Sequence, residues 1–222
     1  MNSTATQTDR FDVMRQAMVA SQLRTNGVSD ARVVAAMARV PREAYLPEDV
    51  SAFAYSDRAV PLPHSRAQNL PIATGKLLTV AELRADDRVL LIGAAGGYTA
   101  AVLAEIVLEV VAVEVDPVLA GAARTSLADY RTVTVVEGAL EAGHAGHAPY
   151  DLLFVDGAVE QLPDALVAQV KAGGRVVAGL ADRGVTRLAY GRRSEGGFAL
   201  LPFADIECVV LPGFARPRSF TF

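Results

Sequence analysis

Hydrophobic residues in the second half of the chain form short runs that alternate with helix-like segments. The apolar runs cover residues 89–92, 107–113, 133–136, 152–155 and 175–178, and helical spacing occurs at 98–105, 117–128 and 161–170. Short apolar strands separated by helices are typical of a parallel sheet that is covered on both faces. We therefore predict a doubly wound, mostly parallel α/β sheet for this part of the chain.

The first part of the chain has a helical pattern followed by an irregular one. Four apolar positions recur at helical spacing: Phe11, Met14, Met18 and Leu23. Gly27 is a suitable end for this helix, and we expect a second helix with Ser29 as its N-cap that ends near Pro41. Residues 51–75 show few periodic positions, which predicts a long irregular segment, and ordered segments of that length are often functional.

The last part of the chain predicts an antiparallel edge. Residues 185–190 and 204–210 have strand-like patterns and are separated by the polar stretch 191–197, which favours a hairpin that closes the sheet. We expect residues 212–222 to form a strap over the surface. Together the patterns predict one domain over residues 1–222, with a helical cap and loop at 9–75 and an α/β core at 76–222.

Composition excludes several classes of protein. The chain has 222 residues, of which 51% are hydrophobic, so a disordered or linker protein is excluded. A net charge of −4 disfavours nucleic-acid binding through phosphate contacts. The single cysteine, Cys208, excludes an internal disulfide or a paired-cysteine metal motif. The longest uncharged stretch, 89–104, is too short to span a membrane, so we expect a cytoplasmic protein without a membrane partner.

Candidate ligand-binding residues follow the first two strands of the predicted core. The first strand leads into GAAGGY (93–98), where Gly93 and Gly97 permit positive φ and a close approach to a ligand. The second strand ends with Glu114, about 20 residues further on, where a carboxylate can accept both hydroxyls of a ribose. Asp116 and Pro117 fit the N-cap and first position of the next helix. The turn lacks the signature of a pyrophosphate site, so S-adenosyl-L-methionine suits it better than NAD.

Eight segments of the chain carry a family pattern. They are MVASQL (18–23), RVVAAM (32–37), VPRE (40–43), AYSD (54–57), VLLIG (89–93), GYTAAVLA (97–104), APYD (148–151) and GGRVV (173–177). In these segments, over roughly residues 14–212, the chain resembles protein-L-isoaspartate O-methyltransferases. The resemblance implies a seven-stranded fold that uses S-adenosyl-L-methionine. It also implies methylation of the free carboxylate of isoaspartyl residues in damaged proteins or peptides.

The resemblance also implies a set of cofactor-binding residues. Gly93, Ala95 and Gly97 would line the methionine end, Glu114 would hold the ribose, and Glu137 and Gly138 would lie beside the adenine. Three places differ from the family. Leu91 stands where an acid is usual, Ala95 where the middle glycine of the turn is usual, and Gly138 and Ala139 where Asp-Gly is usual after Glu137.

The acceptor segment differs more strongly from the family. Members carry a Gly-Gln-Thr-Ile-Ser-x-Pro segment, whereas this chain has PHSRAQNLP at 63–71. Anchored on Pro71, Asn69 takes the place of the serine, and Arg66 and Ala67 replace the glutamine and threonine. Asn69 offers N–H donors, and Arg66 can pair with a carboxylate through two hydrogen bonds. We therefore predict that Asn69 and Arg66 contact the acceptor.

Two other functions remain open. Asp156 is expected at the end of a central strand, a position where small-molecule O-methyltransferases often place a metal or acceptor ligand. The first alternative is therefore a related methyltransferase with another acceptor. A member that keeps the fold as a binding or regulatory protein is the second alternative. His144 and His147 are expected in an exposed loop, and no metal site is predicted. His64 lies in the acceptor segment, where a contact with the substrate and a surface position both remain open.

Overall fold

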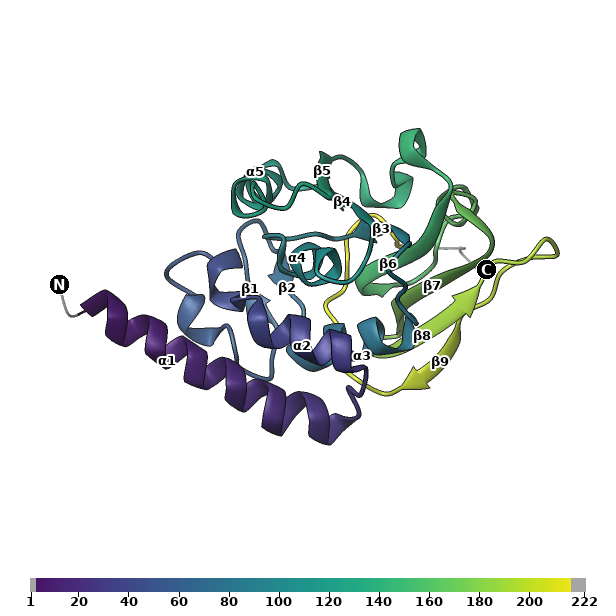
Figure 1. Cartoon of the computed structure of the whole chain (residues 1–222). Helices are drawn as coiled ribbons and strands as arrows, with labels where there is room; N and C mark the ends of the chain where they lie inside the picture. The colour runs from purple at the N-terminus through teal and green to yellow at the C-terminus, as the bar shows by residue number, and fades with distance from the viewer. Residues whose placement is uncertain (1–2, 217–222) are drawn as a thin grey trace.

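The protein is described by a computed structural model that covers residues 3–216 (Figure 1). Its main element is a seven-stranded sheet with the order β5-β4-β3-β6-β7-β8-β9. The strands are β3 (Arg88–Ile92), β4 (Glu109–Glu114), β5 (Val133–Glu137), β6 (Tyr150–Val159), β7 (Val170–Asp182), β8 (Val185–Arg192) and β9 (Leu201–Ala204). Strands β3 to β7 pair in parallel, and β8 and β9 add an antiparallel edge. The predicted fold class is confirmed.

Helices cover both faces of this sheet. They are α1 (Ser3–Ala17), α2 (Ala31–Arg39), α3 (Pro71–Val80), α4 (Tyr98–Ala104), α5 (Pro117–Ser126) and α6 (Asp164–Val167). Neighbouring residues of a strand point to opposite faces, so Leu91 packs in the cluster that contains α2, α3 and α4. Leu90 and Ile92 pack in a second cluster with Leu166 of α6 and Phe214. Both faces of β3 are therefore buried against apolar side chains, which explains its uninterrupted apolar sequence.

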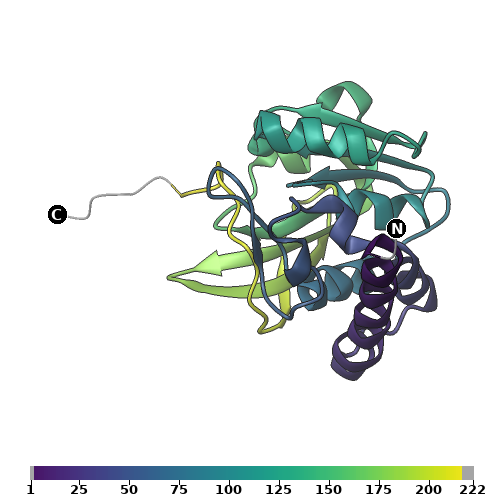
Figure 2. The same ribbon diagram turned by 90° about the vertical axis from the view of Figure 1, so that its left-hand side faces the viewer.

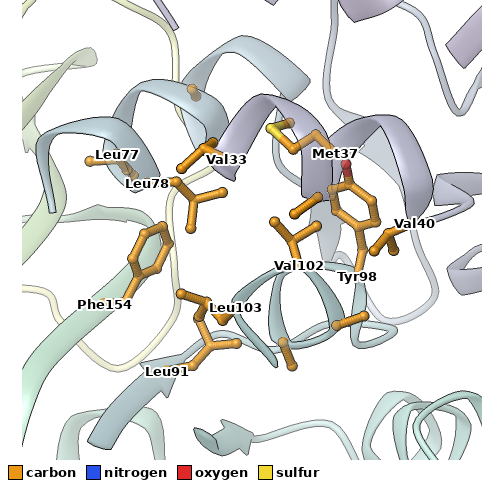
Figure 3. Packing of buried hydrophobic residues seen from close by; sticks show 14 of the residues in the cluster. Val33, Met37, Val40, Leu77, Leu78, Leu91, Tyr98, Val102, Leu103 and Phe154 are labelled. Carbon is orange, nitrogen blue, oxygen red and sulfur yellow. The ribbon is translucent and has the colours of Figure 1, made fainter. Parts of the chain in front are cut away.

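The larger cluster joins the N-terminal helices to the sheet (Figure 3). Met37 of α2 and Leu78 of α3 face α4 across an apolar interior, and Leu91 and Phe154 close it from the sheet. All four side chains are fully buried. The helical N-terminal part is thus packed directly on the sheet.

The first predicted helix is present, and one predicted cap is wrong. After α1 the chain continues through a π-helix (Met18–Leu23) and a 3-10 helix (Arg24–Asn26), and Gly27 ends it in the left-handed region with φ of +82°. The N-cap of α2 is Asp30 and not Ser29, because the Asp30 carboxylate accepts the backbone N–H of Arg32 at 2.8 Å.

Three other predicted elements need correction. Within 51–75, the chain forms a small hairpin of β1 (Val60–Pro61) and β2 (Ala67–Gln68), and α3 already begins at Pro71. The helix expected at 161–170 is only α6, because buried Val170 starts β7 by pairing with Tyr150. The strand expected at 204–210 is largely absent. There, the backbone N–H groups of residues 208 and 209 bond to side chains of Thr186 and Asn69 instead of a neighbouring strand.

The segment after β9 returns to the centre of the molecule. Figure 2 shows it in yellow beside the blue segment that carries β1 and β2, in agreement with the bond from Val209 N to Asn69 Oδ1. Leu211 and Phe214 are buried against the second face of the sheet. The strap expected at 212–222 falls outside the described residues beyond position 216. Within the described part of the chain, no helix is both long and apolar enough to cross a lipid bilayer.

Truncation of Leu103 tests the packing of α4 on the sheet. Leu103 is fully buried in the larger cluster, so Leu103→Ala should lower the free energy of unfolding by about 2–5 kcal/mol. Val118→Ala on α5 is the matched control, because Val118 is 55% exposed and its truncation should cost no more than about 0.5 kcal/mol. Urea denaturation measures both values, and equal losses would contradict the described packing.

Candidate functional site

The candidate site lies where the strand order reverses. The chain passes from β5 across to β6, so β3 has β4 on one side and β6 on the other. Ligands of open α/β sheets bind beyond the carboxyl ends of the strands at such a point. Two buried acids stand there, Glu114 at the end of β4 and Asp156 near the end of β6.

The turn after β3 has the backbone conformation that its glycines predict. Gly93 and Gly97 have φ of +82° and +102°, and a Cβ at Gly97 would lie only 2.8 Å from Leu127 Cδ1. Ala95 also lies in the left-handed region, with φ of +47°. That conformation costs an ordinary residue roughly 1–2 kcal/mol. The Ala95 N–H helps to hold it, because it donates to Glu114 Oε2 at 2.7 Å.

Glu114 is fully buried and accepts hydrogen bonds from five N–H groups. Three are backbone groups: Ala95 N to Oε2, and Val115 N and Asp116 N to Oε1 at 3.0 and 3.1 Å. The other two belong to Arg66, whose Nε and Nη2 donate to the two oxygens at 3.1 and 3.0 Å. The charge of a buried carboxylate requires compensation of this kind. Glu114 is therefore a buried and oriented carboxylate that is paired with Arg66 of this chain, and its role in binding a ribose stays a prediction.

Arg66 reaches Glu114 from the turn that joins β1 and β2. Leu62 N donates to the Arg66 carbonyl, and Arg66 N donates to the Pro63 carbonyl at 3.1 Å. His64 and Ser65, the two central residues of this turn, have φ of +54° and +59°. This is the pattern of a type I′ turn, which normally uses glycine or asparagine.

Asp156 is the centre of a second buried polar group. Its carboxylate accepts Asn69 Nδ2 at 3.1 Å, Thr74 Oγ1 of α3 at 2.9 Å and Thr99 Oγ1 of α4. Asn69 Oδ1 in turn accepts the backbone N–H groups of Leu70 and Val209. Asn69 is 2% exposed, and its amide is fully used within the chain. Its predicted contact with an acceptor stays a prediction.

Arg42 positions the segment that carries Asn69. Its guanidinium is buried, donates to the carbonyl oxygens of Ala54 and Asn69, and lies 4.8 Å from the centroid of the Tyr98 ring. Burial lowers the pKa of Arg42 and raises the pKa of Tyr98 to about 12. The Tyr98 hydroxyl and Arg42 Nη1 have no hydrogen-bond partner among the described residues.

The outer positions of the predicted site are more open. Glu137 is exposed, and its Oε2 lies 3.7 Å from Nη1 of Arg124. A Cβ at Gly138 would meet nothing within 4 Å. Strand register brings Glu137 opposite Glu114. On the other side, Leu211 covers the turn: a Cβ at Gly93 would lie 3.0 Å from its Cδ1. The chain is therefore open at Gly138 after β5, whereas the turn after β3 is covered.

These residues fit the kind of group that the sequence predicts. Glu114 is a fixed carboxylate at the end of the next strand, and a Cβ at Gly138 would meet nothing within 4 Å, whereas Gly93 and Gly97 face Leu211 and Leu127 of this chain. S-adenosyl-L-methionine has a ribose for the acid and an adenine for the open side of Gly138. Leu91, at the position where the family has an acid, instead packs in the core.

Comparison with known proteins identifies the family. The model of the protein-L-isoaspartate(D-aspartate) O-methyltransferase family matches residues 14–206. The chain belongs to this family. A protein-L-isoaspartate O-methyltransferase of Methanoculleus marisnigri is 36% identical over 201 residues, which cover 90% of this chain and 91% of the relative. Protein-L-isoaspartate O-methyltransferase 1 of Rhodopseudomonas palustris is 38% identical over 207 residues, which cover 91% of this chain and 84% of the relative.

Solved structures agree on the fold. One protein-L-isoaspartate O-methyltransferase structure superposes with a TM-score of 0.78 at 23% identity, covering 90% of this chain and 66% of that chain. A Plasmodium falciparum structure described as a protein-L-isoaspartate O-methyltransferase, in complex with S-adenosyl-L-homocysteine, gives a TM-score of 0.72 at 16% identity. This superposition covers 89% of this chain and 97% of that chain.

The predicted site residues fall into two groups. Ala95, Glu114 and Arg66 meet in one hydrogen-bonded set, and Asn69 belongs to the other set with Asp156. Asp156 was considered as a metal or acceptor ligand, but its carboxylate is occupied by three donors of the chain. Among the described residues, no cluster of His, Cys, Asp and Glu is arranged for a metal. Sequence reasoning missed Thr74 and Thr99, whose only signal was a hydroxyl in an otherwise apolar helix.

Removal of the Asp156 carboxylate should destabilise the fold. Asp156→Ala leaves three buried donors without an acceptor, and each hydrogen bond to a charged group contributes about 1.5–3 kcal/mol. We expect the free energy of unfolding to fall by more than about 3 kcal/mol in urea denaturation. Asp182→Ala, at an exposed position, is the control and should have little effect. A near-neutral Asp156→Ala would mean that these donors have other partners.

Cys208 should be unreactive in the folded protein. Burial raises the pKa of its thiol to about 12, and only the thiolate reacts with disulfide reagents. At pH 8 the native protein should therefore label much more slowly than the same protein unfolded in urea, which should take up one equivalent because the chain has one cysteine. Absorbance of the released thiol measures both rates. Equal rates would place Cys208 at the surface.

Proposed function

We propose that this chain transfers a methyl group from S-adenosyl-L-methionine to the free carboxylate of isoaspartyl residues in proteins or peptides. The match of the family over residues 14–206 carries the proposal. The site adds a physical reason, because an oriented carboxylate, Glu114, follows a left-handed glycine turn at the reversal of strand order.

Methyl transfer to a carboxylate makes modest demands on the protein. S-adenosyl-L-methionine supplies a methyl group on a positively charged sulfur, which an oxygen nucleophile attacks in line. The acceptor carboxylate is already ionised at pH 7, so no residue has to remove a proton. The chain has to hold the two partners in line and exclude water, and such positioning can contribute about 7–11 kcal/mol.

The described contacts explain how the chain keeps this geometry. Glu114 is fixed by three backbone N–H groups that do not depend on a ligand. Asp156 links α3, α4 and Asn69, so the segment at the acceptor side is fixed to the sheet. We place the acceptor next to the Arg66 and Asn69 segment. The extended substrate chain would cross the N-terminal cap at that point.

The assignment of Glu114 is tested by cofactor binding. Glu114→Ala removes the acceptor for the ribose hydroxyls. Because it also leaves five buried N–H groups without their acceptor, binding is measured on protein that circular dichroism shows to be folded. We expect the dissociation constant of S-adenosyl-L-methionine to rise at least tenfold, which corresponds to about 1.4 kcal/mol or more. Glu109→Ala is the matched control, because Glu109 lies at the opposite end of the same strand and pairs with Arg88. Isothermal titration calorimetry gives both constants, and an unchanged value for Glu114→Ala would contradict the assignment.

The acceptor is tested by a methylation assay with paired peptides. An isoaspartyl peptide should take up the labelled methyl group, and the same peptide with ordinary aspartate should not. Cofactor binding without transfer to the isoaspartyl peptide would indicate another acceptor. Absence of saturable cofactor binding would indicate a family member that acts as a binding protein.

A further inference from the structure

The carboxylate of Glu114 has no acceptor capacity left while Arg66 is bound. A carboxylate has about four lone-pair sites, and five N–H groups already donate to Glu114. The three backbone groups belong to the fixed turn and the start of α5. Arg66 is the single side chain among the five donors. With the three backbone donors in place, about one site becomes free when Arg66 leaves, so a ribose hydroxyl can donate to Glu114 only after Arg66 releases it.

The turn that carries Arg66 is built to be held by these contacts. Its central residues, His64 and Ser65, are both in the left-handed region without being glycine, and such conformations cost of order 1–3 kcal/mol each and occur at switch regions. Two contacts keep this turn in place. Arg66 donates to Glu114 at the end of β4, and His64 Nδ1 pairs with Asp116, the N-cap of α5. Once these contacts break, the strain favours another conformation of the turn.

We propose that Arg66 exchanges partners during the reaction cycle. Without cofactor, it pairs with Glu114 and closes the ribose position. When Glu114 takes the ribose hydroxyls, Arg66 is released with an uncompensated charge near the acceptor side. Its guanidinium then binds the isoaspartyl carboxylate through the same two parallel N–H donors. This inference rests on the proposed function and deepens it, since it makes Arg66 a specificity-determining residue and couples cofactor binding to acceptor binding.

The first test measures binding of S-adenosyl-L-homocysteine, which requires no catalysis. Arg66→Met removes the internal competitor, so we expect the dissociation constant to fall at least fivefold relative to the unmodified protein. Arg66→Lys keeps the charge but not the two-pronged geometry, and it should lie between the two. It also serves as the variant more certain to fold, as checked by circular dichroism. Arg39→Met is the control, because Arg39 pairs with Glu105 at the surface.

The second test measures the coupling between the two ligands. In the unmodified protein, saturating S-adenosyl-L-homocysteine should strengthen the binding of an isoaspartyl peptide at least fivefold, and the peptide should strengthen the binding of S-adenosyl-L-homocysteine by the same factor. In Arg66→Met and Arg66→Lys the peptide should bind more weakly, and the coupling should fall towards one. The aspartyl form of the peptide should show no coupling.

The outcomes separate this inference from the proposed function. If the unmodified protein binds S-adenosyl-L-homocysteine but neither Arg66 variant binds it more tightly, the exchange is refuted and the proposed function stands. The exchange is also refuted, and the proposed function also stands, if the isoaspartyl peptide and S-adenosyl-L-homocysteine strengthen each other's binding equally in the unmodified protein and in both Arg66 variants. If neither the unmodified protein nor the variants bind S-adenosyl-L-homocysteine, both ideas are refuted. Binding that appears only in the Arg66 variants would refute both ideas, because the unmodified protein would then have no cofactor-bound state in which Arg66 could exchange partners.

Discussion

The architecture of the site depends on the cost of burying a negative charge. Glu114 is fully removed from water, and an isolated carboxylate in that position would be strongly unfavourable. Its compensation comes from three different parts of the chain: the turn after β3, the entry to α5, and the turn between β1 and β2. These segments are consequently held in one arrangement, because a shift of any of them would leave the charge exposed to an apolar interior.

Asp156, on the other side of β3, is also a buried carboxylate whose charge is compensated by hydrogen bonds from the chain. Glu114 ends β4 and Asp156 lies near the end of β6, so the two acids flank the central strand. Each binds one side chain of the same short segment, Arg66 on one side of β2 and Asn69 on the other. The N-terminal part is thus attached to the sheet by two polar contacts in addition to its apolar contacts, and both lie near the carboxyl ends of the strands beside β3.

Much of this arrangement follows from the sequence, and the rest depends on contacts between distant residues. Uninterrupted apolar runs predicted β3 and β4, and the spacing from the glycine turn predicted that Glu114 ends the second of these strands. Both signals are local in the sequence. The short helix α6 and the loop around Cys208 were mispredicted, because distant partners decide their structure: Val170 pairs with Tyr150, and Val209 N bonds to Asn69. The pairing of Arg66 with Glu114 had no local signal, since the two residues lie 48 positions apart.

The bond from Val209 to Asn69 also bears on how the chain reaches its native state. It joins residues 140 positions apart, and Asn69 bonds in turn to Asp156, 87 positions away. Closing loops of that length costs chain entropy before the contacts repay it, and chains rich in such contacts fold slowly. The parallel sheet can therefore assemble while the segment over its carboxyl ends is still loose. We therefore expect the hydrogen bonds of this segment to form after the strand pairs of the sheet.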